Sequence, residues 1–308
     1  SGEFTYATEA IRKGGHGDST AENLNATPGS PDMIVALDRL QAMAPKVESV
    51  SLVVAWFGND LRCGHCAIRP GVEVAEKASS PKTWSVNGIA RADAHLVSRD
   101  FEDRPVYGGT PADFAVVQAI REMNRVGLVI DMSHSAERST LEAIEYSTRP
   151  IAITHANPAS WHPALRNKSD EVLKALAASG GMVGFSLYPH HLKNLSDCTL
   201  PDFCAMVADT AEKMGIDHIG IGSDLCQDQP DSVVAWMRNG RWTRDTDYGE
   251  GSSSTPGFPD PPAWFRDNRD FPALGQELLT VGFSKVEVRQ IMGGNWLEFF
   301  RRSFTREN

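Results

Sequence analysis

The sequence predicts an α/β protein with a (β/α)8, TIM-barrel-like architecture whose first half is irregular. From about residue 110 onward, short β-branched runs that end in polar residues alternate with amphipathic helical segments, a pattern typical of parallel strands joined by helices. The chain has 308 residues, 41% of them apolar, so its length and composition fit one large core. We therefore expect a single barrel domain over residues 1–308.

Four consecutive β/α units are expected in the regular part of the chain. Their strands are predicted at residues 128–132, 151–154, 182–185 and 219–222. Thr110, Ser169 and Thr199 have the side chains of helix N-caps, and Gly127 and Gly215 follow the last apolar positions of two helices. Four such units make half of a barrel.

The last third of the chain is expected to contain a long loop and two helices. Residues 227–275 are rich in Asp, Pro, Gly, Ser and Trp without periodicity, which predicts an ordered loop over one face of the barrel. Residues 284–304 have helical periodicity, and Gly293-Gly294 is expected to divide them into two helices. The predicted packed stripe of these helices consists of Val288, Ile291, Leu297 and Phe300.

The first 110 residues contain few clear elements. Residues 4–7 and 50–56 have the composition of strands, and residues 34–43 that of a helix between them. Beyond residue 70, only residues 84–86 and 106–107 are short strand candidates. Four secure strands cannot be counted here, which is why the first half of the barrel is expected to be irregular.

Composition excludes several classes of function. The formal charge of −10 repels phosphate backbones, so we expect no nucleic-acid partner. The apolar runs are far shorter than the roughly 18 to 20 residues that span a bilayer, so no membrane span is expected. Five cysteines form no dense disulfide framework, which predicts reduced thiols and a cytoplasmic location. Cys63 and Cys66 have C-x-x-C spacing, but no second pair completes a zinc site, which favours ordinary loop thiols.

Polar side chains follow four successive predicted strands. They are His134, His155, Tyr188 and Asp224. Because the carboxyl ends of parallel barrel strands share one mouth, we expect these side chains to converge. A single histidine after a strand more often caps a helix or bonds a loop carbonyl, but two on adjacent strands, with an acid further on, point to a metal ion that activates a water.

A set of motifs that contains these residues resembles the membrane (renal-type) dipeptidase family of binuclear zinc peptidases. The motifs are Arg-Glu-Met-Asn-Arg-Val-Gly-Leu-Val-Ile-Asp-Met-Ser-His (121–134), Ile-Thr-His-Ala-Asn (153–157), Arg166-Asn167, Gly-Ile-Gly-Ser-Asp (220–224) and Met-Gly-Gly-Asn-Trp-Leu-Glu-Phe-Phe (292–300). The resemblance covers about residues 121–304, and the motifs occur in the family's order.

The resemblance implies a zinc-dependent dipeptidase, with two zinc ions where the site is complete. It implies that His134 and His155 are metal ligands, that Arg166 holds the substrate's carboxylate, and that Asp224 carries the proton. The chemistry of the side chains agrees, because a guanidinium binds a carboxylate through two parallel hydrogen bonds and an aspartate can act as general base and then acid. Tyr188 is a candidate for the substrate pocket, with rim packing as the alternative.

The same resemblance implies further ligands in the first half of the chain. His16-Gly-Asp18 has the expected His-x-Asp spacing but lies in a Gly-rich loop, which is the alternative interpretation. A bridging glutamate is not found, because Glu73 and Glu76 are predicted to lie on a helix surface. His95 is a weak candidate for the remaining histidine.

The N-terminal 120 residues resemble a different barrel, the TIM-barrel-like domain of gene-transfer-agent and phage-tail proteins. The stretches that carry this likeness are residues 51–62, 68–73 and 105–113. The two resemblances imply one barrel built from residues 1–120 and 121–308, joined inside a helix at about 119–123. Such a chimera is physically plausible because barrel halves have similar strand tilt and helix packing.

Three functions remain open on the sequence. The first is a zinc dipeptidase whose partner is a small dipeptide, with a homodimer left open. The second is a catalytically silent chimeric or structural barrel with an incomplete metal site. The third is a glycosidase, which would need two carboxylates about 5 to 10 Å apart, and Asp60 with Asp224 is the pair to test.

Overall fold

The computed structural model describes residues 2–14, 19–44, 52–58, 67–225, 232 and 259–304. They form a mixed α/β fold that divides into two compact units. Unit 1 comprises residues 1–130, 146–148 and 304–308, and unit 2 comprises residues 131–145 and 149–303. Among the described residues, no helix combines the length and the apolar composition that a membrane crossing requires.

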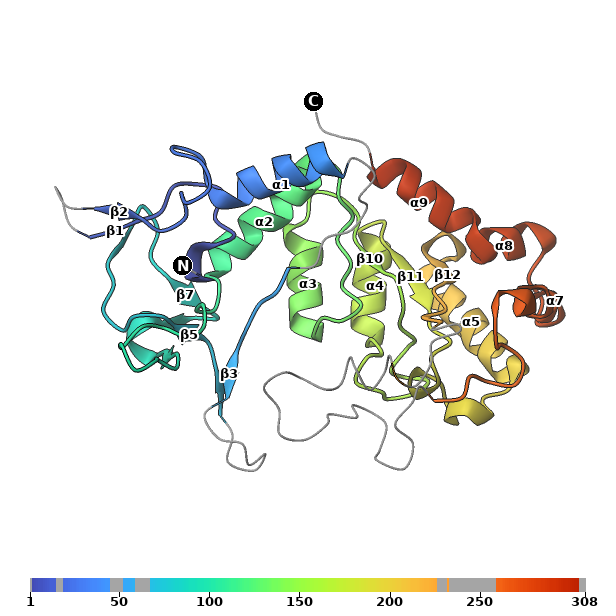
Figure 1. Cartoon of the computed structure of the whole chain (residues 1–308). Coiled ribbons are helices and arrows are strands. Elements are labelled where there is room, and N and C mark those ends of the chain that lie inside the picture. The colour runs from blue at the N-terminus through green and yellow to red at the C-terminus, as the bar shows by residue number, and fades with distance from the viewer. Residues whose placement is uncertain are drawn as a thin grey trace. The chain divides into compact units, whose positions relative to one another are not determined.

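A three-stranded parallel sheet lies in unit 2 (Figure 1). Its strands are β10 (Ala152–Ile153), β11 (Met182–Phe185) and β12 (Ile219–Ile221), paired in chain order. Val183 lies in the centre, paired with Ile153 on one side and Ile219 on the other. Asp131 adds one isolated parallel bridge to Ala152. The parallel order predicted from the β/α alternation is therefore confirmed for these three strands, whereas residues 128–132 contribute a single bridge instead of the predicted strand.

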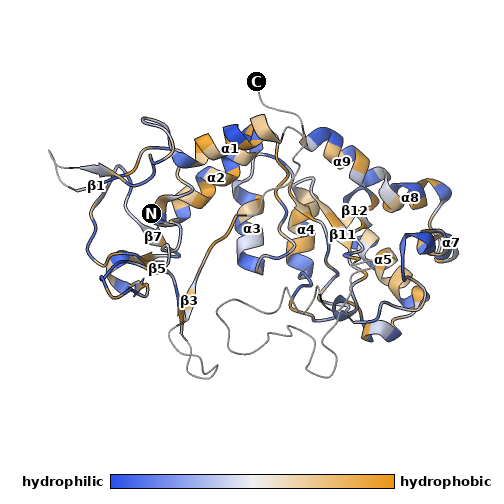
Figure 2. Ribbon diagram, in the orientation of Figure 1, coloured by the Kyte–Doolittle hydropathy of each residue, from blue (hydrophilic) through white to orange (hydrophobic). Residues whose placement is uncertain are grey.

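Unit 2 also contains helices, some of which contact the sheet. They are α3 (Glu137–Tyr146), α4 (Asp170–Ala178), α5 (Leu200–Met214), α7 (Phe271–Thr280), α8 (Lys285–Arg289) and α9 (Asn295–Ser303). Helix α4 contacts β11, and α5 and α9 contact β12. The hydroxyls of Ser169 and Thr199 accept hydrogen bonds from the first turns of α4 and α5, as predicted. Hydrophobic residues colour much of β11 and α4 in Figure 2.

The C-terminal helices depart from the prediction in two places. Helix α7 begins at Phe271, so the predicted loop over residues 227–275 is wrong at its end; residues 226–231 and 233–258 lie outside the described residues. In the predicted stripe, Ile291 is buried but Leu297 is 62% exposed, and Phe299 is buried instead. A π-helical turn at Gln290–Gly294, kinked at Gly293 with φ of 148°, shifts the helical phase and turns a different face inward. The predicted break at Gly293 is confirmed.

Unit 1 contains two long helices and several two-residue strands. They are α1 (Asp32–Met43), α2 (Asp113–Val126), β1 (Arg12–Lys13), β2 (Thr20–Ala21), β3 (Phe57–Gly58), β4 (Ile68–Arg69), β5 (Gly71–Val72), β6 (Ser79–Ser80), β7 (Ser85–Val86), β8 (Ile89–Ala90) and β9 (His95–Leu96). The first three-stranded sheet is antiparallel in the order β2-β1-β6, and β5 pairs with β9 in parallel. Part of the core of unit 1 is formed by Phe4, Ala7, Ile11, Val72, Trp84, Val86, Ala112 and Ala115. The irregularity predicted for this part of the chain is present.

Several local predictions for unit 1 are wrong. Residues 2–4 form a 3-10 turn, and Ala7 donates its N–H to the carbonyl of Phe4, so two buried side chains three residues apart mark a turn instead of a strand. Residues 52–56 form no strand, and residues 50–51 lie outside the described residues. Thr110 is not the cap of α2, whose N-cap is Ala112; its hydroxyl instead donates to the carbonyl of Ala55 and accepts from Gly71.

A buried ionic cluster stabilises the loop that follows β5. Lys77 lies 2.7 Å from Glu22 and 3.1 Å from Glu3, and Arg91 lies 2.6 Å from Glu3. Burial opposes ionisation of Glu3, but the hydrogen bond from Arg91 and the charge of Lys77 outweigh it and hold its pKa below the ordinary value. Glu73 lies 3.7 Å from Lys77 with a largely buried side chain, so its predicted place on a helix surface is wrong.

In the described residues, the strands form a three-stranded parallel sheet in unit 2 and short, mostly antiparallel pairs in unit 1, and they do not form a closed barrel. Both cysteines in the described part of the chain, Cys198 and Cys204, are buried free thiols, and burial raises the pKa of each to about 12.

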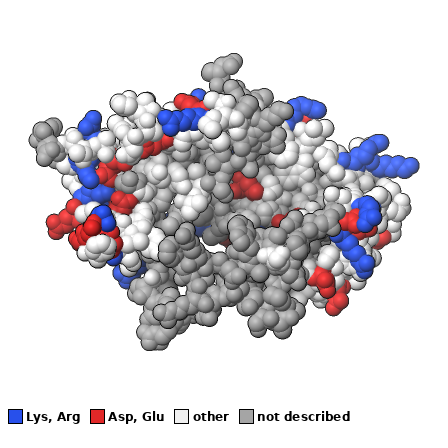
Figure 3. Space-filling view, viewed as in Figure 1, with Lys and Arg blue, Asp and Glu red and all other residues white. Residues whose placement is uncertain are grey.

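On the face shown in Figure 3, acidic side chains lie among the basic ones.

Candidate functional site

Two histidines meet at the carboxyl end of the parallel sheet in unit 2. His134 follows the bridge residue Asp131, and His155 follows β10. Their Nε2 atoms are 3.0 Å apart, and the ring planes are inclined by 65°. The convergence predicted for these two imidazoles is therefore present.

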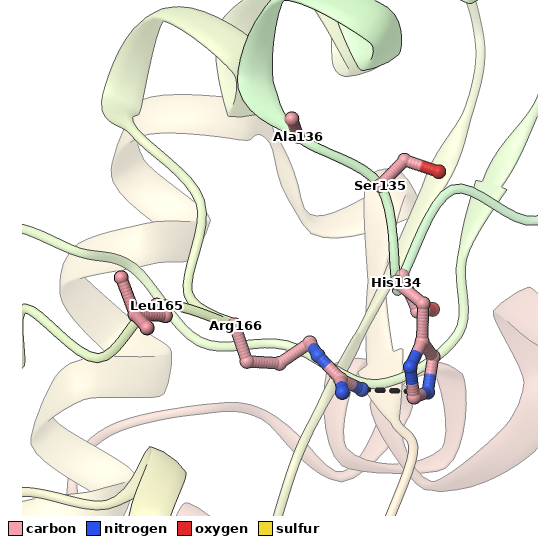
Figure 4. A pocket seen from close by; sticks show the side chains of 6 residues that line it. His134, Ser135, Ala136, Leu165 and Arg166 are labelled. Atoms are coloured by element: carbon pink, nitrogen blue, oxygen red, sulfur yellow. Dashed lines mark hydrogen bonds between the residues drawn. The ribbon is translucent and has the colours of Figure 1, made fainter. Parts of the chain in front are cut away.

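The guanidinium of Arg166 lies against both imidazoles. Its Nη1 is 2.7 Å from His134 Nε2 and 2.9 Å from His155 Nε2, and Figure 4 shows the side chain pointing to His134. A guanidinium nitrogen can only donate, so both Nε2 atoms act as acceptors with their lone pairs directed to one point. For Nε and Nη2 of Arg166, the described part of the chain offers no hydrogen-bond partner.

The charges around His134 favour the neutral imidazole. Burial and the positive charge of Arg166 lower the pKa of His134 below its ordinary value of 6.5, with a further contribution from His155. Asp224 and Asp131 act in the opposite direction, which places both carboxylates within electrostatic range of the ring. The sum leaves His134 as a neutral acceptor, the form in which histidine binds metals.

A carboxylate and two hydroxyls support the histidines from behind. Asp131 Oδ1 accepts from the backbone N–H and the hydroxyl of Ser133, at 3.0 and 2.6 Å, and from the N–H of Thr154 at 3.1 Å. Asp131 Oδ2 lies 2.6 Å from Thr154 Oγ1, which lies 3.0 Å from Nδ1 of His155. Burial raises the pKa of Asp131, but the hydrogen bonds from Ser133 and Thr154 outweigh this and lower it below the ordinary 3.8.

Two glycines let the strands approach this network closely. A Cβ atom at Gly184 in β11, or at Gly222 just after β12, would overlap with the carbonyl oxygen of Thr154. The segments that follow β11 and β12 are also close to each other, because Leu187 donates its backbone N–H to the carbonyl of Ser223. The glycines therefore allow the backbone beside His155 to sit where it does.

Two buried asparagines fix the loop that carries Arg166. Asn157 and Asn167 each donate a side-chain N–H to the carbonyl of His191, at 3.0 Å, and Asn167 Oδ1 accepts the N–H of Asn157 at 2.9 Å. His191 is buried, and its Nδ1 lies 2.8 Å from Ser186 Oγ. Burial, with the charge of Arg166, lowers the pKa of His191 to about 3, so this ring is neutral.

A buried lysine connects the loops of the two site residues His134 and Arg166. Lys168 is 4% exposed, and its Nζ donates to the carbonyl of Ser135 at 2.5 Å. Burial and the nearby charge of Arg166 lower the pKa of Lys168 to about 8, whereas Asp131 and Glu137 favour the ammonium.

The other two predicted site residues lie on the neighbouring strand ends. Asp224 is exposed and has a left-handed backbone with φ of 52°, a conformation that aspartate tolerates better than most residues and that is common near functional sites. Tyr188 is half-buried, with ring centroids 5.6 and 5.1 Å from His190 and His191. Asp224 therefore acts on the charge of His134, whereas Tyr188 packs on the adjacent turn.

An open pocket of about 200 Å3 adjoins His134 and Arg166. It is lined by Ser133, His134, Ser135, Ala136, Leu165 and Arg166. Leu165 is fully exposed, and in Figure 4 it lies at the side of the pocket opposite His134.

Several of the predicted candidates are not among the described residues. His16, Asp18, Asp60, and the pair Cys63 and Cys66 lie outside the described residues. Within the described ranges, no group of three or more His, Cys, Asp or Glu side chains is arranged to hold a metal ion.

The ring of His95, the weak histidine candidate, stacks on Phe57 in unit 1 with centroids 5.9 Å apart. This contact gives His95 a packing role there.

Sequence reasoning did not identify three residues that shape the site. Asp131 and Thr154 are in the motifs 121–134 and 153–157, close in sequence to His134 and His155, but the sequence does not show their hydrogen bonds. Lys168 had no signal, because a lysine two residues after Arg166 ordinarily reads as a solvated loop cation.

Residues 83–235 match the family model described as Membrane dipeptidase (Peptidase family M19). The match begins before residue 121 and includes residues 105–113, which the sequence alone had linked to a different barrel family. Dipeptidase tcpJ of Claviceps purpurea is 26% identical over 183 residues, 59% of this chain and 36% of that protein. Dipeptidase verJ of Clonostachys rogersoniana is 32% identical over 123 residues, 39% of this chain and 30% of that protein. The chain thus spans about a third of the length of these curated relatives.

Two solved structures are similar in fold. An amidohydrolase from Pseudomonas aeruginosa has 30% sequence identity and a TM-score of 0.55, covering 64% of this chain and 59% of that chain. Dipeptidase AC, a metallo peptidase of family M19, has 22% identity and a TM-score of 0.50, covering 64% of this chain and 49% of that chain. The mixed α/β fold is therefore shared with these two proteins.

Proposed function

We propose that this chain forms part of a zinc-dependent dipeptidase that hydrolyses small dipeptides. One observation carries the proposal: the Nε2 lone pairs of His134 and His155 converge, 3.0 Å apart, beside the guanidinium of Arg166. The match of residues 83–235 to the membrane dipeptidase family supports it, because the three residues lie inside the matched range.

The donor set fits a zinc-type ion in two coordination positions. Nitrogens 3.0 Å apart can both lie about 2.0 to 2.1 Å from one ion, and both accept from the guanidinium of Arg166, so each has a lone pair that could bind the ion. A catalytic zinc takes three protein ligands, so a further donor is needed in addition to these two histidines. When bound, the metal would polarise the scissile carbonyl and acidify a water.

The other residues have roles that follow from their chemistry. The Nε and Nη2 groups of Arg166 form an edge with two parallel N–H donors, which suits the terminal carboxylate of a dipeptide. Asp224 lies within electrostatic range of His134 and is exposed, so it can take a proton from a water and give it to the departing amine. Tyr188 lines the turn beside them.

Metal content and hydrolysis test the proposal together. Purified protein is analysed for bound metal and assayed on a dipeptide panel with and without a chelator. We expect bound zinc, chelator-sensitive cleavage, and loss of both in His134→Ala and His155→Ala. His218→Ala is the matched control, because His218 directly precedes β12, at the end of the strand away from the site, and is hydrogen-bonded to the carbonyl of Gly181.

The alternative of a silent barrel with an incomplete metal site makes the opposite prediction. Zinc well below one ion per chain, together with no dipeptide cleavage after zinc is added, would support it and refute the dipeptidase. Glycoside cleavage by a protein that leaves dipeptides intact would favour the glycosidase interpretation instead.

A further inference from the structure

The hydrogen bonds around Thr154 determine where the protons must lie. A hydroxyl has one proton, and Thr154 Oγ1 has three polar neighbours: Asp131 Oδ2 at 2.6 Å, His155 Nδ1 at 3.0 Å and Ser133 Oγ at 3.1 Å. The carboxylate oxygen is the nearest of them. Because Asp131 also accepts two backbone N–H groups, it is an acceptor, and the Thr154 proton points to it.

The Ser133 hydroxyl cannot supply a proton to Thr154 either. Its oxygen lies 2.6 Å from Asp131 Oδ1, closer than to Thr154, and it accepts the backbone N–H of His155 at 3.2 Å. Its single proton therefore also goes to Asp131. Thr154 Oγ1 can then only accept from the ring of His155, which requires a proton on Nδ1.

The opposite side of the ring leads to the same assignment independently. Arg166 Nη1 only donates, and it lies 2.9 Å from Nε2 of His155, so this nitrogen has an unprotonated lone pair. A neutral imidazole has one N–H, and the contacts on both sides place it on Nδ1.

We propose that Asp131 and Thr154 act as a relay that holds His155 in the Nδ1–H tautomer with its Nε2 lone pair directed into the site. Both are positioning residues, because they act through His155 and touch no substrate. The inference rests on the proposed function for its purpose, since a metal ligand needs that lone pair. Carboxylate support of a ligating histidine is a general feature of metal sites, and here a threonine hydroxyl stands between the two groups.

The proton position can be read in metal-free protein. Histidine is labelled with nitrogen-15, and long-range proton–nitrogen correlations at a pH where the ring is neutral show which nitrogen of His155 is protonated; His155→Gln identifies the signal. We expect Nδ1–H in the unaltered protein and in Thr154→Ser, and a substantial Nε2–H population in Thr154→Val and Asp131→Asn. Thr140→Val is the matched control, because Thr140 is a buried threonine of the same unit whose hydroxyl donates to the carbonyl of Ala136.

Zinc affinity, measured by competition with a chromogenic chelator, gives the second readout. Thr154→Val is expected to bind zinc about 10 to 100 times more weakly than the unaltered protein, with Thr154→Ser and Thr140→Val unchanged. An unaltered protein with its proton on Nε2, or a Thr154→Val variant that keeps Nδ1–H, would overturn the relay. Failure to cleave dipeptides would leave the tautomer result intact, so the two proposals fail separately.

Discussion

The buried ring of His191 makes the stability of the fold depend on pH in a way that can be calculated. Its pKa is about 3 in the folded chain against an ordinary value of 6.5. Between these values the unfolded chain binds a proton at this position and the folded chain does not, so stability falls as the pH decreases from about 6.5 towards 3. The perturbation is His191→Gln, which keeps a polar side chain but removes the titration.

The magnitude follows from the two pKa values. Each pH unit in this window costs the unaltered protein about 1.4 kcal/mol relative to the variant. At pH 7 the variant is less stable by about 1 to 3 kcal/mol, because it disturbs the buried bond to Ser186. At pH 4.5, two pH units below 6.5, the difference in free energy of unfolding between the unaltered protein and the variant has narrowed by about 2.7 kcal/mol.

Urea unfolding followed by tryptophan fluorescence at pH 7, 6, 5 and 4.5 measures the difference. Every other titrating group is common to both proteins, so the difference between the two free energies of unfolding isolates His191. A difference that stays constant over this range would refute the reasoning, because it would mean that the ring titrates alike in the folded and unfolded chains.

Three further predictions follow from single contacts. Arg166→Lys keeps the charge but loses the paired donors, so KM for dipeptides rises about tenfold or more, measured by steady-state kinetics. Ser169→Ala removes the cap of α4 and lowers the free energy of unfolding by about 1 kcal/mol in urea titrations, with zinc binding unchanged. Gly222→Ala forces a Cβ into the carbonyl of Thr154 and lowers the free energy of unfolding by about 1 to 3 kcal/mol. Gly275→Ala, in the open middle of α7, is the control and raises the free energy of unfolding by up to about 1 kcal/mol. Equal effects of the two substitutions would contradict the close approach at Gly222.

The elements that the sequence predicts well are those specified by neighbouring residues. Ser169 and Thr199 cap their helices, Gly127 and Gly215 end theirs, and the short run Met-Val-Gly-Phe at 182–185 forms β11 with its predicted bounds. These signals are local, because a cap or a left-handed glycine acts within one turn of helix.

The predictions that failed depend on contacts between distant residues. Glu73 is in the buried ionic cluster because Lys77 meets Glu3 there, about seventy residues away in sequence, and no periodicity around Glu73 could show this. Leu297 is exposed because the wide turn before it changes the phase of the helix. In both places, a contact between distant residues or a feature of the backbone outweighs the local pattern.

The sequence predicts one part of the candidate site but not the other. His134 and His155 could be predicted to meet, because parallel strands bring their carboxyl ends together. Their support by Asp131 and Thr154 could not, because a hydrogen bond between side chains depends on distances of a few tenths of an ångström that strand order does not specify.

The local charge of the site gives a physical reason to favour an anionic substrate on an acidic protein. The whole chain has a formal charge of −10, yet Arg166 lines the pocket and the buried Lys168 lies two residues further along the chain, so both positive charges favour a negative group at Arg166. Burial and Arg166 already reduce the affinity of Lys168 for its proton, so a carboxylate that binds at Arg166 would relieve the repulsion between the two cations. The overall negative charge repels large polyanions, while a small molecule with a single carboxylate can still enter the pocket and reach Arg166. The terminal carboxylate of a dipeptide, the substrate proposed above, would meet this requirement at Arg166.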